Sequence, residues 1–180
     1  MPSGFVATTL SHVKTLHLLR HAKSSWDDEA LADHERPLAP RGRRDAKAIA
    51  EHLKRTLASG PELVLCSSAV RTRQTLELVA PGLGEPRIEY DEAIYGASAG
   101  GLMARLRAVP DGVESVLVIG HNPGLQDLAL ELASTGAQLP RLAAKFPTCA
   151  VATLAVAGPW SALEDGDAEL TAYVIPKQLR

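Results

Sequence analysis

The sequence predicts an α/β protein built as a three-layer α/β/α sandwich around a mostly parallel sheet. Two observations support this prediction. Short apolar runs alternate with amphipathic, helix-like segments along most of the chain, and three of those runs end abruptly in charged or polar residues. An alternation of strands and helices favours parallel pairing, because the crossover helices then cover both faces of the sheet.

One domain is expected from the length of 180 residues, which suffices for a single hydrophobic core. Residues 13–180 are predicted to form it, and residues 1–12 to be a flexible lead-in. The lead-in has no basic residue ahead of its apolar ones, unlike a secretory signal. No segment approaches the ~18 consecutive apolar residues of a membrane helix.

The first predicted strand, Val13–Leu19, lacks a polar alternation, as expected for a central strand covered on both faces. It ends in Arg20-His21. The next segment, Asp27–Gly42, is rich in charge and carries two prolines, which predicts a loop. Apolar residues then recur every three or four positions over Arg43–Leu57, which predicts an amphipathic helix.

The remaining elements continue the alternation. Leu63–Cys66 is predicted as a strand followed by a helix through Val79, and Val116–Ile119 as a buried strand that ends in Gly120-His121. Further predictions are an edge strand at Arg87–Tyr90, helices at Gly100–Val109 and Leu125 to about Ala133, and a hairpin-like pair, Cys149–Ala157 with Glu169–Ile175, that closes one edge of the sheet.

Charge and cysteine content limit the possible partners and the compartment. The net charge is −2, so no overall basic field favours nucleic acid or an anionic membrane as a partner. The two cysteines lie far apart and without C-x-x-C spacing, which fits a reducing compartment and predicts a cytoplasmic protein.

Polar side chains follow three predicted strands of the sheet. Arg20-His21 follows the first, Arg71 lies shortly after the second, and His121 follows the buried strand at Val116–Ile119. Ligands of open α/β sheets bind beyond the carboxyl ends of the strands, so these residues are expected to meet. The planar fork of arginine suits phosphate oxygens, and a neutral imidazole can attack phosphorus. The set therefore predicts a phosphoryl site with His21 as nucleophile and no metal requirement.

Three other chemistries find little support. His17 and His21 are spaced like a helical metal pair but belong to a predicted strand, so no zinc site is expected. Cys66 and Arg71 are one residue closer together than the pair in cysteine-dependent phosphatases, which favours Cys66 as a buried strand residue. The glycines of 96–101 lack the dinucleotide-binding pattern, and His12, His34 and His52 are expected to be surface or packing residues.

Three ordered motifs resemble the histidine phosphatase superfamily, also called phosphoglycerate mutase-like. They are Leu-Leu-Arg-His-Ala-Lys-Ser-Ser-Trp at 18–26, Ser-Ser-Ala-Val-Arg-Thr-Arg-Gln-Thr at 67–75 and Val-Ile-Gly-His-Asn-Pro-Gly at 118–124. Ala22 replaces the glycine of the usual Arg-His-Gly motif, which is similar to the small bacterial phosphohistidine phosphatases. The resemblance implies a phosphoglycerate mutase-like fold over residues 13–180.

The same resemblance implies roles for individual residues. His21 would be the phosphorylated nucleophile, with Arg20, Arg71 and His121 around the phosphate. Glu92 precedes Tyr95-Gly96 much as the general acid does in mutase-like members, although a solvated turn carboxylate is an equal alternative. The remaining predicted substrate-binding residues are Ser24 and Arg36.

The predicted function is a metal-independent phosphatase, without cofactor, that works through a covalent phosphohistidine. A phosphohistidine protein is the first expected substrate. An imidazole leaving group, with a reference pKa near 6.5, needs less help from an acid than an alkoxide does. Two alternatives remain open: a phosphomonoesterase for a small metabolite, and a non-catalytic phosphate-binding module on the same fold.

Overall fold

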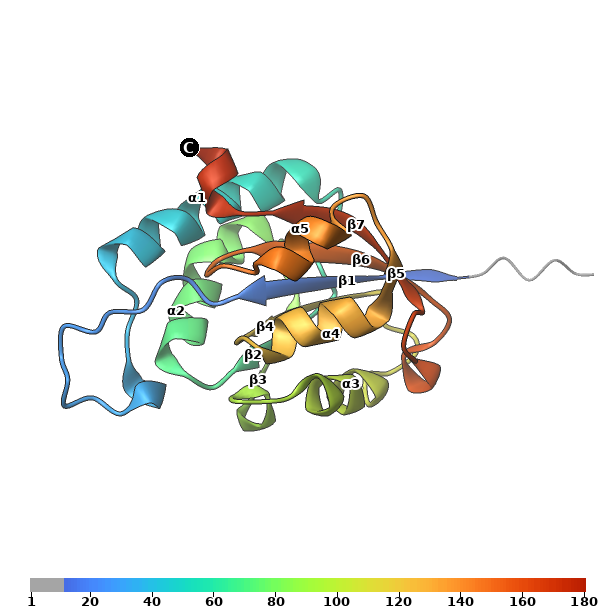
Figure 1. The fold of residues 1–180 in the computed structure, drawn as a ribbon, viewed down its shortest axis with the longest axis horizontal. Coiled ribbons are helices and arrows are strands. Elements are labelled where there is room, and N and C mark those ends of the chain that lie inside the picture. The colour runs from blue at the N-terminus through green and yellow to red at the C-terminus, as the bar shows by residue number, and fades with distance from the viewer. Residues whose placement is uncertain (1–11) are drawn as a thin grey trace, which may run out of the picture.

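A computed structural model describes residues 12–180 of the chain (Figure 1). The strands are β1 (Val13–Arg20), β2 (Leu63–Ser67), β3 (Arg87–Asp91), β4 (Ser115–Gly120), β5 (Ala133–Thr135), β6 (Val151–Ala157) and β7 (Ala168–Val174). The helices are α1 (Pro40–Thr56), α2 (Val70–Val79), α3 (Ala99–Arg107), α4 (Gly124–Leu132) and α5 (Leu139–Ala144). Short 3-10 turns are η1 (Asp33–Glu35), η2 (Ala80–Gly82), η3 (Glu92–Ile94), η4 (Trp160–Ala162) and η5 (Pro176–Leu179).

The strands form one seven-stranded sheet in the order β3-β2-β4-β1-β6-β7-β5. Four neighbouring pairs are parallel, and the two pairs made by β6 are antiparallel. The predicted mostly parallel sheet is therefore confirmed, as is the edge position of β3. The antiparallel pairing of β6 with β7 is also confirmed, but the prediction that this pair closes the sheet edge is wrong.

The outer edge beside β7 belongs to β5, and β6 lies inside the sheet next to β1. The three residues of β5 follow α4 directly, so no apolar periodicity marks them as a strand, and α5 was likewise not predicted. Helix α1 begins at Pro40, three residues before the predicted start. Proline fits the first turn of a helix, whose N–H groups have no helical partner, so Pro40 opens the helix rather than extending the loop.

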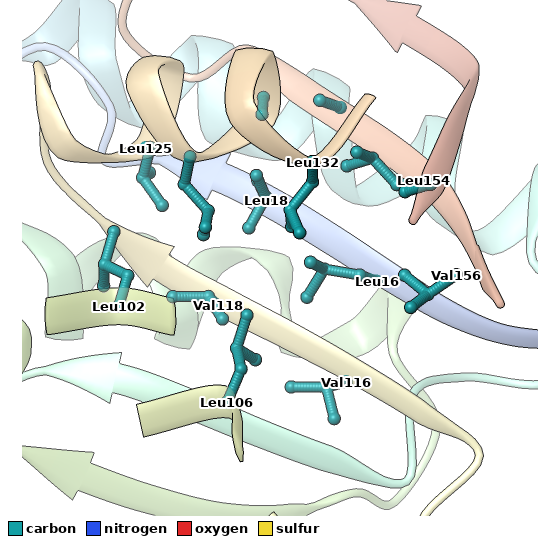
Figure 2. Close-up of a cluster of buried hydrophobic side chains, with 14 of the residues drawn as sticks. Leu16, Leu18, Leu102, Leu106, Val116, Val118, Leu125, Leu132, Leu154 and Val156 are labelled. Atoms are coloured by element: carbon teal, nitrogen blue, oxygen red, sulfur yellow. The ribbon is translucent and has the colours of Figure 1, made fainter. Parts of the chain in front are cut away.

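Two hydrophobic clusters pack on opposite faces of the sheet. Leu16 and Leu18 of β1 point into the cluster under α3 and α4, whereas Leu19 points into the one under α1 and α2. Val116 and Val118 of β4 point into the same cluster as Leu16 and Leu18 (Figure 2), whereas their neighbours Leu117 and Ile119 belong to the other cluster. Because both faces are covered, these strands carry apolar residues at successive positions, and the three-layer prediction is confirmed.

The predicted lead-in at 1–12 lies outside the described residues except for His12, which is exposed. Among residues 12–180, no helix is long and apolar enough to cross a membrane.

Acidification is expected to destabilise the fold through His17, a buried side chain on β1 that shares a hydrogen bond of 2.9 Å with the Thr153 hydroxyl. Burial lowers the pKa of His17 to about 4. In the unfolded chain this imidazole has an ordinary pKa near 6.5, so it binds a proton between pH 6.5 and 4, whereas in the folded chain it stays neutral over that range. The resulting loss in the free energy of unfolding is absent above pH 6.5, grows as the pH falls, and reaches about 2 kcal/mol between pH 7 and 5.

Urea unfolding at pH 7 and pH 5 checks the expectation for His17. The variant His17→Gln has no titrating group there, so its loss of stability between the two pH values should be about 2 kcal/mol smaller than that of the wild type. An equal loss in both proteins would assign the acid sensitivity to other groups.

Candidate active site

The parallel strands β1 and β4 deliver two histidines to the same edge of the sheet. Arg20, the last residue of β1, is paired with Gly120, the last residue of β4, so His21 and His121 follow at the same level. Their ring centroids are 5.2 Å apart. Arg71 reaches this edge from the first turn of α2 and donates toward His121 Nδ1 over 3.3 Å. The structure thus brings His21, Arg71 and His121 together, as the strand ends predicted.

His21 is held as a neutral ring with one free nitrogen. Its Nδ1 lies 2.8 Å from the Ala22 carbonyl oxygen, which only accepts, so Nδ1 carries the proton and Nε2 keeps its lone pair. Burial, followed by the nearby His121 and Arg71, lowers the pKa of His21 to about 3 against the opposing Ala22 bond. At neutral pH the Nε2 atom is therefore available to attack phosphorus.

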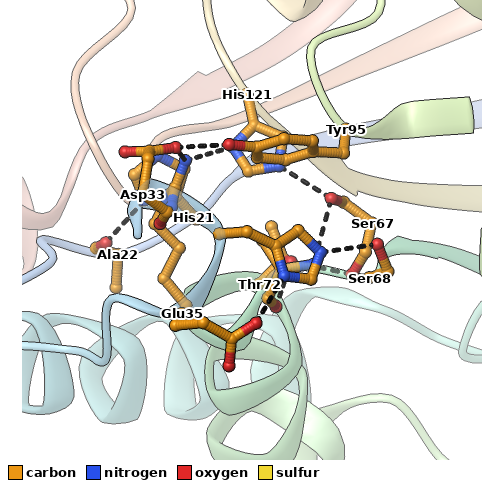
Figure 3. A network of polar contacts seen from close by, with 12 residues as sticks. His21, Ala22, Asp33, Glu35, Ser67, Ser68, Thr72, Tyr95 and His121 are labelled. Atoms are coloured by element: carbon orange, nitrogen blue, oxygen red, sulfur yellow. Dashed lines mark hydrogen bonds and ion pairs between the residues drawn. The ribbon is translucent and has the colours of Figure 1, made fainter. Parts of the chain in front are cut away.

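His121 is oriented by two polar partners. Arg71 only donates, so His121 Nδ1 accepts, and its Nε2 donates to the Ser67 hydroxyl at 2.7 Å (Figure 3). Burial and the Arg71 charge lower the pKa of His121 to about 4. Ser67, at the end of β2, was not predicted as a site residue.

Arg20 is half-buried beside His21. One terminal nitrogen donates to the Phe146 carbonyl oxygen at 2.9 Å, and its Nε is buried without a partner within the described residues. Burial and then Arg71 lower its pKa, and arginine remains charged at neutral pH. The guanidinium keeps donors for an anion while the Phe146 contact fixes its position.

Asp33 of η1 engages Arg71 in a way that the sequence did not reveal. Arg71 donates to the Asp33 main-chain oxygen at 2.6 Å and to its carboxylate at 2.9 Å. The Tyr95 hydroxyl donates to the same carboxylate at 2.7 Å (Figure 3). The Tyr95 bond, together with Arg71, lowers the pKa of Asp33 despite some burial. A phosphoryl group bound by both terminal nitrogens of Arg71 would replace these contacts.

A pocket of about 210 Å³ opens at this site. Of the predicted phosphate- and substrate-binding residues, Arg20, Arg71 and the buried Ser24 line it, and His121 is not among its lining residues. Arg36 does not line it either: it is buried, donates to the Asp28 carbonyl oxygen at 3.2 Å and lies 3.9 Å from the centre of the Trp26 ring. Arg36 therefore positions the exposed Trp26 at the pocket. The lining consists of Arg20, His21, Lys23, Ser24, Trp26, Asp33, Arg71 and Thr148.

Glu92, the predicted general acid, is exposed on η3. Within residues 12–180 its carboxylate makes no hydrogen bond or ion pair with Arg20, His21, Arg71 or His121. The carboxylate that contacts the site is that of Asp33. No motif spacing marks Asp33, because it lies in the short 3-10 turn η1 between β1 and α1, whose position depends on tertiary packing.

Both cysteines are buried and are held as unreactive thiols. Cys66 lies on β2, and burial raises its pKa to about 12, while burial also raises the pKa of Cys149. Because the thiolate is the reactive form of cysteine, a raised pKa leaves Cys66 unreactive at neutral pH. Its buried position on β2 agrees with the sequence prediction. Among residues 12–180 there is no group of three histidine, cysteine or acidic side chains able to hold a metal ion.

Comparisons with known proteins assign the chain to a family. The family model of the histidine phosphatase superfamily (branch 1) matches residues 16–122. An uncharacterised protein of Mycobacterium tuberculosis is 42% identical over 163 residues, which cover 88% of this chain and 100% of that protein.

Two solved structures are similar over almost their whole length. One, from Nakamurella multipartitia and assigned as a phosphohistidine phosphatase SixA, has a TM-score of 0.79 at 32% identity and covers 91% of this chain and 96% of its own. The protein histidine phosphatase SixA complexed with tungstate has a TM-score of 0.76 at 30% identity over 92% and 99% of the two chains. The chain therefore belongs to the histidine phosphatase superfamily and is a histidine-dependent phosphatase.

Proposed function

We propose that this phosphatase hydrolyses phosphohistidine on a protein through a covalent intermediate on His21, without a metal ion. The observation that carries the proposal is the free lone pair on His21 Nε2, held beside two arginines and His121. All the positive charge that the mechanism needs comes from side chains that the fold has already positioned.

In the first step, His21 Nε2 attacks phosphorus, the new N–P bond forms, and the bond to the leaving group breaks. Negative charge on the equatorial oxygens is met by Arg20 and Arg71, with His121 alongside. The Ala22 carbonyl accepts from Nδ1 and stabilises the positive charge that develops on the ring. The leaving nitrogen or oxygen takes a proton from solvent or from a carboxyl group.

In the second step, water attacks the phosphohistidine and the N–P bond breaks. Inorganic phosphate leaves, the water proton passes to solvent or to a carboxylate, and His21 returns to its neutral form. The low pKa of His21 favours this return, because a weakly basic imidazole is a good leaving group.

Two features favour phosphohistidine as the substrate. The exposed Glu92 leaves the site without a committed acid, which an imidazole leaving group tolerates better than an alkoxide. Of the similar solved structures, the one at 32% identity is assigned as a phosphohistidine phosphatase and the one at 30% is described as a protein histidine phosphatase. A small-metabolite phosphomonoesterase is the second candidate function, and the Asp33 carboxylate in the pocket favours it. The intact set of catalytic side chains argues against a non-catalytic phosphate-binding module.

We also infer one catalytic domain over residues 13–180 and a cytoplasmic location. The single sheet supports the first inference, and the two buried free thiols support the second, because cysteines outside disulfides suit a reducing compartment.

The variants Glu92→Gln and Asp33→Asn test this function, because they remove the two carboxyl groups considered as general acids. Turnover of a phosphohistidine peptide and of a small phosphate ester is measured in each. With phosphohistidine as the natural substrate, Glu92→Gln is expected to keep turnover of the peptide within about threefold, because imidazole leaves without a strong acid. A carboxyl acting as general acid would instead cost about 10²-fold or more on the ester. A comparable loss on the peptide, or turnover of the ester alone, would contradict the assignment.

A further inference from the structure

A second pocket, of about 180 Å³, lies beside the catalytic pocket and shares Thr148 with it as a wall. Three segments that are distant in sequence converge there. The first turn of α1 supplies Arg41, the segment that leads into β6 supplies Lys145, and the chain after β7 supplies Lys177 and Arg180. We name these four side chains the basic pocket.

The topology explains why this pocket lies at the catalytic edge. β6 runs antiparallel to β1, and β7 antiparallel to β6, so β7 points in the direction of β1 and delivers the C-terminal residues to the edge where His21 lies. In Figure 1, η5 accordingly lies beside α1 at the end toward which the β1 arrow points. The segment after Lys145 is tied to the catalytic strand, since Phe146 accepts from Arg20 and the Cys149 amide donates to the His21 carbonyl oxygen.

The charges of the basic pocket are only partly compensated. The one acidic side chain that lines the same cavity, the buried Asp45, is paired with Arg180 and lies 3.6 Å from Arg41. Lys145 and Lys177 are exposed and have no ion-pair partner within residues 12–180. The side chains of the lining therefore carry an excess of three positive charges, on a chain whose side chains sum to a net charge of −2. Such a local excess attracts an anionic group and steers an acidic partner to this face.

We propose that the basic pocket binds an acidic side chain of the phosphorylated protein, next to the phosphohistidine that enters the catalytic pocket. This inference rests on the proposed protein substrate and adds its specificity: the phosphohistidine has acidic neighbours. The shared wall at Thr148 lets one substrate occupy both pockets, and the exposed lysines meet the partner at the surface.

The test compares two phosphohistidine peptides, one with glutamates and one with glutamines around the phosphohistidine. The wild type is expected to favour the acidic peptide by about tenfold in kcat/KM at low salt, and Lys145→Ala combined with Lys177→Ala to reduce this preference to about twofold or less. High salt should weaken the wild-type preference. Lys47→Ala combined with Lys54→Ala removes two exposed lysines of α1 that do not line this cavity; this double variant is the matched control and should behave like the wild type.

Hydrolysis of p-nitrophenyl phosphate separates the possible failures. It should be unchanged in the double variant, which shows that folding and the catalytic pocket are intact. Equal kcat/KM for the two peptides in the wild type, or an undiminished preference in the double variant, overturns the inference. If neither peptide is turned over, the proposed function fails. Inhibition of ester hydrolysis by the unphosphorylated acidic peptide then tests whether the basic pocket binds acidic side chains. Inhibition of the wild type but not of the double variant supports such binding, and no inhibition overturns it. If the double variant instead loses kcat/KM only on a small substrate with two anionic groups, the inference that a protein substrate binds this pocket is also overturned.

Discussion

Replacing His21 by alanine is expected to lower turnover by more than about 10³-fold and to abolish labelling of the protein by a phosphorylated substrate. The reason is that no other neutral imidazole has the same position. His121 has its Nδ1 turned to Arg71 and its Nε2 turned to Ser67, so it offers no free lone pair to phosphorus. Single-turnover reactions with a labelled substrate, quenched at alkaline pH where phosphohistidine persists, measure the effect.

Two further measurements protect this conclusion from a folding defect. His21→Asn keeps a side-chain donor for the Ala22 carbonyl but has no atom equivalent to Nε2, so it should fold normally and remain inactive. Thermal unfolding of both variants provides the control. Turnover close to the wild-type rate in a folded His21→Asn protein would eliminate His21 as the nucleophile.

Replacing Arg71 by alanine is expected to cost about 10² to 10³-fold in kcat/KM, because it removes a fixed charge where the transferred phosphoryl group develops its own. Arg71→Lys should recover little of this loss, since an ammonium cannot form the paired contacts of a guanidinium. Arg71→Ala also removes the charge that, after burial, contributes most to lowering the pKa of His121, so the pKa of that ring should rise part of the way toward its ordinary value, which NMR titration can follow.

Arg73→Ala is the matched control for Arg71. Arg73 lies two residues later on α2, is exposed, and faces the Tyr90 ring rather than the catalytic pocket. Its removal changes the net charge equally and should leave kcat/KM within about twofold, as expected for an exposed charge. Equal losses in the Arg71 and Arg73 variants would reduce the role of Arg71 to general electrostatics.

Most of the sheet could be predicted from the sequence because strands covered on both faces carry uninterrupted apolar residues. Val116–Ile119 shows this on β4, and Leu63–Cys66 on β2. The element that escaped, β5, is three residues long, and two of the three are exposed, so its pairing with β7 depends on where α4 ends rather than on any pattern of its own. Pro40 was misassigned for a related reason, because a proline that opens a helix and one that interrupts a loop look alike in sequence.

The residues of the candidate site likewise fall into those that a local pattern predicts and those that only tertiary packing places. Arg20, His21, Arg71 and His121 were predictable because each lies at or within a few residues after the end of a predicted strand, and parallel strands end at one edge. Asp33, Tyr95 and Ser67 were not, since their contacts depend on how a loop and two distant strand ends pack against Arg71 and His121.

By itself, the sequence determined the α/β architecture and the family, and it predicted that Arg20, His21, Arg71 and His121 meet at one sheet edge, because these features depend on local periodicity and on short motifs. Only the tertiary structure decided which nitrogen of His21 is free, that Asp33 and not Glu92 contacts the arginine, and that β7 returns basic residues to the catalytic edge. Those features depend on distances between segments far apart in the chain, which packing of the folded chain sets and no local pattern encodes.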